Sequence, residues 1–108
     1  MTKIRPFTFF HNPNCSKSRA CLSQVATSKK PFTIRNFIES PLTEQELIEL
    51  LILHHNPIAL LREAKGDEDH GTIIQELLSD PARLQRPLLT TKTELIILRP
   101  DHLLTPYL

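Results

Sequence analysis

The sequence predicts a small α/β (α+β) domain with a mixed four-stranded sheet, and three observations lead to this prediction. Strand-like, helix-like and again strand-like segments follow one another in the first 37 residues. Residues 42–85 have helical patterns, and two short apolar segments lie between them and the C-terminus. A chain of 108 residues has the size of one domain. We therefore expect a single domain, 1–108, with the order β-α-β, a helical insertion at about 42–85, and β-β-α.

The first strand and the first helix are predicted on either side of a short loop. Residues 6–10 have the alternation of a strand, with two phenylalanines on one face. Residues 16–28 have helical periodicity, and either Cys15 or Ser16 can cap that helix. Its apolar stripe is formed by Cys21, Leu22, Val25 and Ala26.

A second strand is predicted at residues 32–37, because apolar and polar side chains alternate after Pro31. Two strands joined through a helix run parallel, and the crossover between them is almost always right-handed. We therefore expect 6–10 and 32–37 to be parallel.

The insertion carries several helix signals. Thr43-Glu44-Gln45-Glu46 matches a capping box, so a helix is expected to begin there and to end near His54-His55. Asn56-Pro57 predicts a second start, with a short helix that includes Arg62. These signals make the insertion helical and not a continuation of the sheet.

The C-terminal part predicts one more helix and a hairpin. A helix is expected from Thr72 to Leu78, where Asp80-Pro81 stops it. Residues 88–90 and 95–98 are strand candidates, and their short separation requires an antiparallel hairpin. A last helical turn is expected within 101–108.

Charge is distributed unevenly along the chain, although the formal net charge is only +1. All seven charged residues up to position 35 are basic, whereas the remainder carries six basic and twelve acidic residues. The basic residues are scattered without interleaved aromatic residues, so nucleic-acid binding is not expected. The asymmetry instead favours attraction of small anions toward the N-terminal part.

Cellular location and metal content are predicted from what the pattern lacks. No apolar run is long enough for a membrane span or a signal peptide, so we expect a cytoplasmic protein without membrane contact. Two cysteines in such a chain are expected to be free thiols. The histidines are scattered without ligand spacing, so no metal is expected.

The segment from His11 to Arg19 is the strongest functional signal. It places Cys15 where a strand ends and a helix begins, next to unpaired N–H groups and the positive end of the helix dipole. Both stabilise a thiolate, so we expect the pKa of Cys15 to lie below the ~8.5 of a free cysteine. The same N–H groups can hold an oxyanion, and His11 and Lys17 add cationic or proton-donating groups. The predicted chemistry is thiolate attack on an oxyanion or a disulfide.

These residues also resemble a known family. The motif His11-Asn12-Pro13-x-Cys15-x-x-Ser18-Arg19 is similar to that of the glutaredoxin-coupled arsenate reductases. The ordered set Arg62, Arg86-Pro87 and Arg99-Pro100 extends the resemblance to most of the chain. The segment between Arg62 and Arg86 is shorter than is usual there, as in shorter paralogues of the family.

The resemblance implies a thioredoxin-like fold and a set of site residues. Cys15 would attack arsenate, and glutathione with glutaredoxin would reduce the adduct and release arsenite, with no bound cofactor. His11 would help to lower the pKa of Cys15, and Pro87 would be the cis-proline beside the cysteine. The oxyanion would be held by Ser18, Arg19, Arg62, Arg86 and Arg99.

Other functions remain open on the sequence alone. A glutathione-dependent reductase of mixed disulfides would use the same Cys15. The family also includes Spx-type regulators that bind RNA polymerase, and these usually carry a Cys-x-x-Cys pair where this chain has Ser18. A member without catalysis is a third possibility. The partners expected are a small oxyanion and glutaredoxin, with the protein as a monomer.

Overall fold

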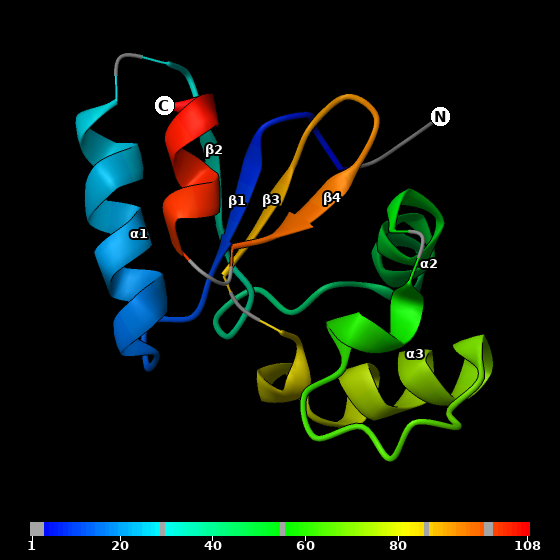
Figure 1. The fold of residues 1–108 in the computed structure, drawn as a ribbon. Coiled ribbons are helices and arrows are strands. Elements are labelled where there is room, and N and C mark those ends of the chain that lie inside the picture. The colour runs from blue at the N-terminus through cyan, green and yellow to red at the C-terminus, as the bar shows by residue number, and fades with distance from the viewer. Residues whose placement is uncertain (1–3, 29, 55, 86, 99–100) are drawn as a thin grey trace.

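Figure 1 shows a four-stranded sheet with helices on both sides. This computed structural model describes residues 4–28, 30–54, 56–85, 87–98 and 101–108, and of 101–103 only the backbone. The elements in chain order are β1 (Thr8–His11), α1 (Ser16–Thr27), β2 (Thr33–Asn36), α2 (Glu44–Leu53), η1 (Pro57–Leu60), α3 (His70–Ser79), η2 (Pro81–Arg83), β3 (Leu88–Thr90), β4 (Leu95–Ile97) and η3 (Asp101–Tyr107), where η denotes a 3₁₀ helix.

The strand order is β2-β1-β3-β4, which confirms the predicted mixed sheet. Strand β1 runs parallel to β2, with Thr8 opposite Thr33, as the β-α-β pattern predicts. It runs antiparallel to β3, which forms the expected hairpin with β4. All four residues of β1 are buried, because the strand has a neighbour on each edge and a layer on each face.

The two faces of the sheet are covered by different helices. On one face, Phe9 packs with Cys21 and Val25 of α1 and with Leu104 of η3. On the other face, Phe10 belongs to a larger cluster with residues of α2 and α3. In Figure 1, α1 and η3 accordingly lie on one side of the sheet, and α2 and α3 on the other. The site-bearing loop therefore enters the smaller, α1-covered layer.

Two local predictions about the N-terminal half are wrong. Strand β1 begins at Thr8 and not at residue 6, because Phe7 adopts a left-handed backbone with φ of 60°. That turn brings the Phe7 ring edge-on to Phe32, with ring centroids 6.3 Å apart. The buried stripe of α1 contains Ser18, Cys21 and Val25, with Leu22 partly buried, whereas Ala26 is exposed.

The capping box of α2 is present as predicted. Thr43 Oγ1 accepts from the Glu46 N–H at 3.2 Å, and Glu46 Oε1 accepts from the Thr43 N–H at 2.9 Å. Glu46 also accepts two hydrogen bonds from the Arg35 guanidinium, at 2.8 and 3.1 Å, which tie β2 to α2. Burial acts to raise the pKa of Glu46, but the bonds from Arg35 and Thr43 leave this pKa below its ordinary value.

The second helix of the insertion is shorter than predicted. It is the 3₁₀ helix η1, which ends at Leu60, because Leu61 pairs antiparallel with Leu84. The Gln85 N–H donates to Leu60 O and the Arg62 N–H to Arg83 O, both at 2.7 Å. Arg62 therefore follows an isolated antiparallel bridge and does not lie in a helix.

Helix α3 begins two residues earlier than predicted. Asp69 is its N-cap, and its carboxylate accepts from the Thr72 N–H at 2.8 Å. The helix ends at Ser79, so the stop predicted at Asp80-Pro81 is confirmed. No helix in the described part of the chain is long and apolar enough to cross a membrane.

Candidate active site

Cys15 is the N-cap of α1, one of the two positions that the sequence allowed. Its backbone is extended, with φ of −108° and ψ of 122°, and 8% of the residue is exposed. The loop from Asn12 to Cys15 follows directly after the buried strand β1. The cysteine is therefore held between a rigid strand and the first turn of a helix of 12 residues.

The first turn of α1 leaves its backbone donors unused. The first main-chain bond is from the Arg19 N–H to Cys15 O at 3.0 Å, and the Cys15 side chain caps no N–H group. Within the described residues, no acceptor is found for the N–H groups of Ser16, Lys17 and Ser18. Backbone N–H groups of this kind at a helix N-terminus are suited to binding an anion.

The loop before the helix is shaped by Asn12, which is 2% exposed. Its carbonyl accepts from the Cys15 N–H at 3.1 Å, and its side-chain Oδ1 accepts from the Asn14 N–H at 2.9 Å. The guanidinium of Arg19 donates to Pro13 O at 2.8 Å and closes the loop from outside. Asn12 was not among the predicted site residues, although Asn-Pro is a recognised turn signal.

His11 and Ser18 join the strand to the helix beneath Cys15. His11 Nδ1 lies 2.7 Å from Ser18 Oγ, and that oxygen also accepts from the Asn12 N–H at 3.0 Å. Burial is the largest cause that lowers the pKa of His11, and the nearby Arg19 lowers it further, while a hydrogen bond with the backbone of Ser18 acts to raise it. His11 is therefore mainly a neutral imidazole at pH 7, not a cation.

The geometry limits how Ser18 and Arg19 can meet an oxyanion. The Ser18 side chain is fully buried and its hydroxyl is bonded within the loop, so its backbone N–H is the group left for a ligand. Arg19 is exposed, and one of its nitrogens is engaged with Pro13 O. Their roles in oxyanion binding remain predictions.

The predicted arginines are placed less completely. Arg62 is half-buried, and its Nη1 is 3.4 Å from Ala82 O. None of its contacts with other described residues reaches the loop at 11–19. Arg86 and Arg99 lie outside the described residues. The predicted cis bond between Arg86 and Pro87 therefore also lies outside them.

The main chain nevertheless brings the neighbouring segments to one edge of the sheet. Phe10 faces Leu88 across antiparallel strands, so the next pair in this register is His11 and Pro87. The Leu98 N–H donates to Pro87 O at 3.0 Å. Leu61 is bridged to Leu84, which lies three residues before Pro87. The edge that carries Cys15 is therefore also where the segments before and after β3 and β4 meet.

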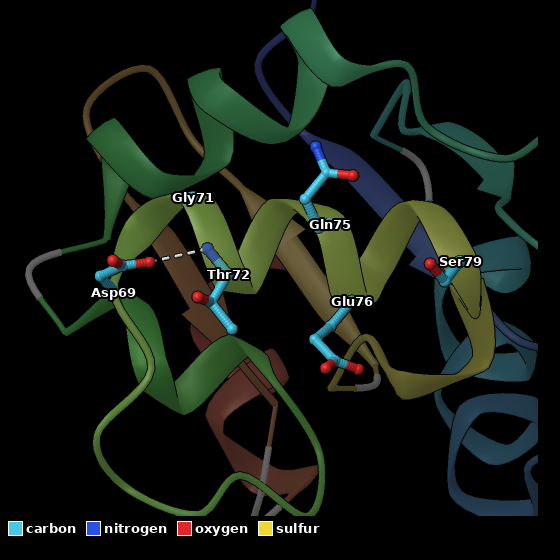
Figure 2. A pocket seen from close by; sticks show the side chains of 6 residues that line it. All are labelled: Asp69, Gly71, Thr72, Gln75, Glu76 and Ser79. Carbon is cyan, nitrogen blue, oxygen red and sulfur yellow. Dashed lines mark hydrogen bonds between the residues drawn. The ribbon is translucent and has the colours of Figure 1, made fainter.

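One cavity of the described residues lies away from Cys15. The cavity in Figure 2 follows one side of α3 and is lined by Asp69, Gly71, Thr72, Gln75, Glu76 and Ser79. Its residues come from α3 and its cap, whereas Cys15 is the N-cap of α1, a helix that lies on the other side of the sheet in Figure 1. No group of three His, Cys, Asp or Glu suited to a metal is found in the part of the chain that the structure describes.

These features define a class of protein before any comparison is made. A β-α-β unit with a cysteine at the first helix N-terminus, followed by an antiparallel hairpin, is a thioredoxin-like fold with a thiol site. Solved structures agree with it. One from Yersinia pestis superposes with a TM-score of 0.77 at 24% identity, over 92% of this chain and 97% of that chain. An arsenate reductase from Vibrio cholerae has a TM-score of 0.77 at 19% identity, over 96% and 100%.

Sequence comparison identifies the family. The model of the ArsC family matches residues 10–103, so the chain belongs to the ArsC family. An arsenate reductase of Yersinia enterocolitica is 28% identical over 106 residues, which cover 88% of this chain and 75% of the relative. An arsenate reductase of Escherichia coli strain K12 has the same identity and coverage. The predicted family is thereby confirmed.

Proposed function

We propose that this protein reduces arsenate to arsenite, with Cys15 as the nucleophile and with glutathione and glutaredoxin as the source of electrons. The observation that carries the proposal is Cys15 at an uncapped helix N-terminus whose N–H groups have no acceptor among the described residues. The substrate is supported by two relatives, both arsenate reductases and each 28% identical to this chain.

In the first step, the Cys15 thiolate attacks the arsenic atom of arsenate. A sulfur–arsenic bond forms, an arsenic–oxygen bond breaks, and the departing oxygen is protonated and leaves as water. The unused N–H groups of Ser16, Lys17 and Ser18 would hold the remaining oxygens, since preset donors stabilise the charge that develops there. The dipole of α1 favours both the thiolate and the bound anion.

In the following steps, two electrons reduce As(V) to As(III). Two thiols supply them, one from glutathione and one from glutaredoxin, and these end as a mixed disulfide. Water then adds to the As(III) centre and the sulfur–arsenic bond breaks, so that arsenite leaves and Cys15 returns to its thiol or thiolate form. Cys21 takes no part in this scheme, because it is fully buried in the cluster around Phe9.

The arginines complete the proposed site. Arg62, Arg86 and Arg99 would approach the oxyanion from segments that meet the edge of the sheet near Pro87. A guanidinium stays charged and offers forked donors that suit an oxyanion. For Arg62, binding requires the guanidinium to move from its long contact with Ala82 O toward the substrate.

The proposal is tested by measuring arsenite formation with arsenate, glutathione and glutaredoxin present. Turnover that stops when glutaredoxin is omitted supports the full scheme. Alkylation of Cys15 at pH 6.5 is measured in parallel, and arsenate should protect the thiol. If a small mixed disulfide is reduced but arsenate is neither reduced nor protective, the mixed-disulfide alternative replaces arsenate reduction.

A further inference from the structure

The side chain of Ser18 is fully buried and has no direct access to substrate, yet its hydroxyl contacts both the His11 ring and the Asn12 N–H. We propose that Ser18 is a positioning residue that holds His11 as the neutral tautomer with its proton on Nε2, so that His11 acts toward the anion at Cys15 as a neutral hydrogen-bond donor. This inference rests on the proposed function for its chemistry, but its structural content can be measured without substrate.

The contacts of the Ser18 hydroxyl determine where its proton lies. The Asn12 N–H can only donate, so Ser18 Oγ accepts that bond at 3.0 Å. The hydroxyl then has one proton to donate. The other contact shown for this oxygen is with His11 Nδ1 at 2.7 Å, which can accept that proton. Ser18 is fully buried, so this proton would lose its acceptor if Nδ1 were itself protonated.

It follows that Nδ1 of His11 is the acceptor and Nε2 carries the proton. Nε2 is not one of the buried side-chain atoms that lack a hydrogen-bond partner, so it either reaches solvent or has a partner. The ring itself is held in place, because it stacks on Phe9 with centroids 6.1 Å apart and an interplanar angle of 24°. The donor direction of His11 is thus fixed by one hydroxyl and one aromatic ring.

The charges around the ring also disfavour a second proton. Among the described residues, Arg19 of α1 is the charged group that acts on His11, and Cys15 is the titratable group that follows in the loop. On the neighbouring strands, β3 carries no charge, and Arg35 of β2 is paired with Glu46 on the opposite face. Among the described residues, no carboxylate contacts the ring to stabilise an imidazolium.

A neutral donor suits the proposed reaction. A neutral imidazole can stabilise a developing anion by its N–H, a mode of catalysis known for histidines whose pKa is lowered at helix N-termini. It keeps the same protonation state throughout the neutral pH range, whereas an imidazolium would lose its charge there. Ser18 therefore acts on the reaction through His11, and Asn12 acts through Ser18.

The direct test is ¹⁵N NMR of the His11 ring in the wild-type protein at pH 7, without substrate. We expect the spectrum of a single Nε2–H tautomer. A ring protonated on Nδ1, or on both nitrogens, overturns the inference. In Ser18→Ala the single tautomer should be lost, and retention of the pure Nε2–H form would equally overturn it.

Activity provides a second readout with matched variants. Ser18→Ala should lower kcat for arsenate about tenfold, the size expected when one hydrogen bond is misplaced. Ser18→Thr keeps a hydroxyl and should restore both the tautomer and most of the rate. Ser23→Ala, an exposed serine of the same helix, should change neither. If Ser18→Ala fails to fold, the wild-type spectrum and Ser18→Thr still decide.

The outcomes separate this inference from the proposed function. A protein that shows the Nε2–H tautomer and its dependence on Ser18, but does not reduce arsenate, contradicts the proposed function alone. A protein that reduces arsenate with His11 protonated on Nδ1 contradicts this inference alone.

Discussion

Helices α1 and α3 begin in opposite ways. At α3, the Asp69 carboxylate accepts from the Thr72 N–H, a bond drawn as a dashed line in Figure 2. At α1, Cys15 holds the N-cap position, but its side chain caps no N–H group of the helix. Both helices start after an irregular polar loop, so the difference lies in the capping residue and not in the surrounding chain.

The difference shows that a helix N-terminus without a side-chain cap lacks the stability that a cap provides. Asp is among the best N-cap residues, and such a cap contributes about 1 kcal/mol to stability. Cys15 makes no such cap, and the N–H groups of Ser16, Lys17 and Ser18 have no acceptor among the described residues. Stability in this part of the molecule comes instead from the buried bonds of Asn12 and Ser18 beneath the thiol. Residues 11–18 thus combine a hydrogen-bonded loop with a helix N-terminus that has no side-chain cap.

The largest effect is expected from making α1 resemble α3. Cys15→Ser should abolish arsenate reduction, because the thiolate is lost. The free energy of unfolding should stay the same or rise by up to about 1 kcal/mol, because Ser is a good N-cap. Arsenite formation and urea denaturation measure the two effects. A variant that keeps its rate, or that is strongly destabilised, would contradict the assignment of Cys15.

The next effect concerns the anion that the free end of α1 would hold. Arg62→Ala should raise the KM for arsenate about tenfold, since a charged hydrogen bond contributes about 1.5–3 kcal/mol. Arg62→Lys should recover only part of this, as should Arg86→Lys relative to Arg86→Ala, because a point charge lacks the fork of a guanidinium. Lys92→Ala, in the exposed turn of the hairpin, removes the same charge and should leave KM unchanged.

A smaller effect sharpens the contrast from the side of α3. Asp69→Ala should lower the free energy of unfolding by about 1 kcal/mol, because the Thr72 N–H loses its acceptor. The rate of Cys15 alkylation should stay as in the wild type, since this cap lies on the other face of the sheet. Denaturant midpoints and alkylation rates are measured together. An altered alkylation rate would show that the two helix ends are coupled.

The smallest effect is a dependence of stability on pH. Burial and Arg19 lower the pKa of His11 below the 6.5 of the unfolded chain. Between these two pKa values the unfolded state binds more protons, so stability is full above about 6.5 and falls as the pH drops below it. His11→Gln should remove this part of the pH dependence. Equal pH profiles for the two proteins in urea denaturation would contradict it.

Much of the fold could be predicted because it depends on local signals. The capping box at Thr43, the stop at Pro81 and the apolar runs of the hairpin each act over a few residues. Leu61 could not be assigned from sequence, because its partner Leu84 is distant along the chain and nothing local favours a bridge over one more helical turn. The turn at Phe7 was missed for a similar reason, since this residue, with φ of 60°, contacts Phe32, which is distant along the chain.

The site was predictable in its position and less so in its bonding. A cysteine between a strand and a helix is visible in the sequence, and the structure places Cys15 there. The neutral state of His11 was not predicted, because it depends on burial and on Arg19 in the folded protein. Likewise, Ser18 looks like a helical polar residue until α1 is docked on β1, which turns its hydroxyl inward.

The bridge between Leu61 and Leu84 affects how far the segment between them can change in length. It closes the excursion from Arg62 to Arg83 at its base, with main-chain bonds from Arg62 to Arg83 and from Gln85 to Leu60. Residues can be gained or lost in the largely exposed loop at 63–69, beyond this bridge, with little effect on the chain below it, which leads to Pro87 beside His11. The bridge thus keeps the start of β3 in place when the loop changes. Its hydrogen-bonded amide protons should exchange more slowly than those of the loop at 63–69.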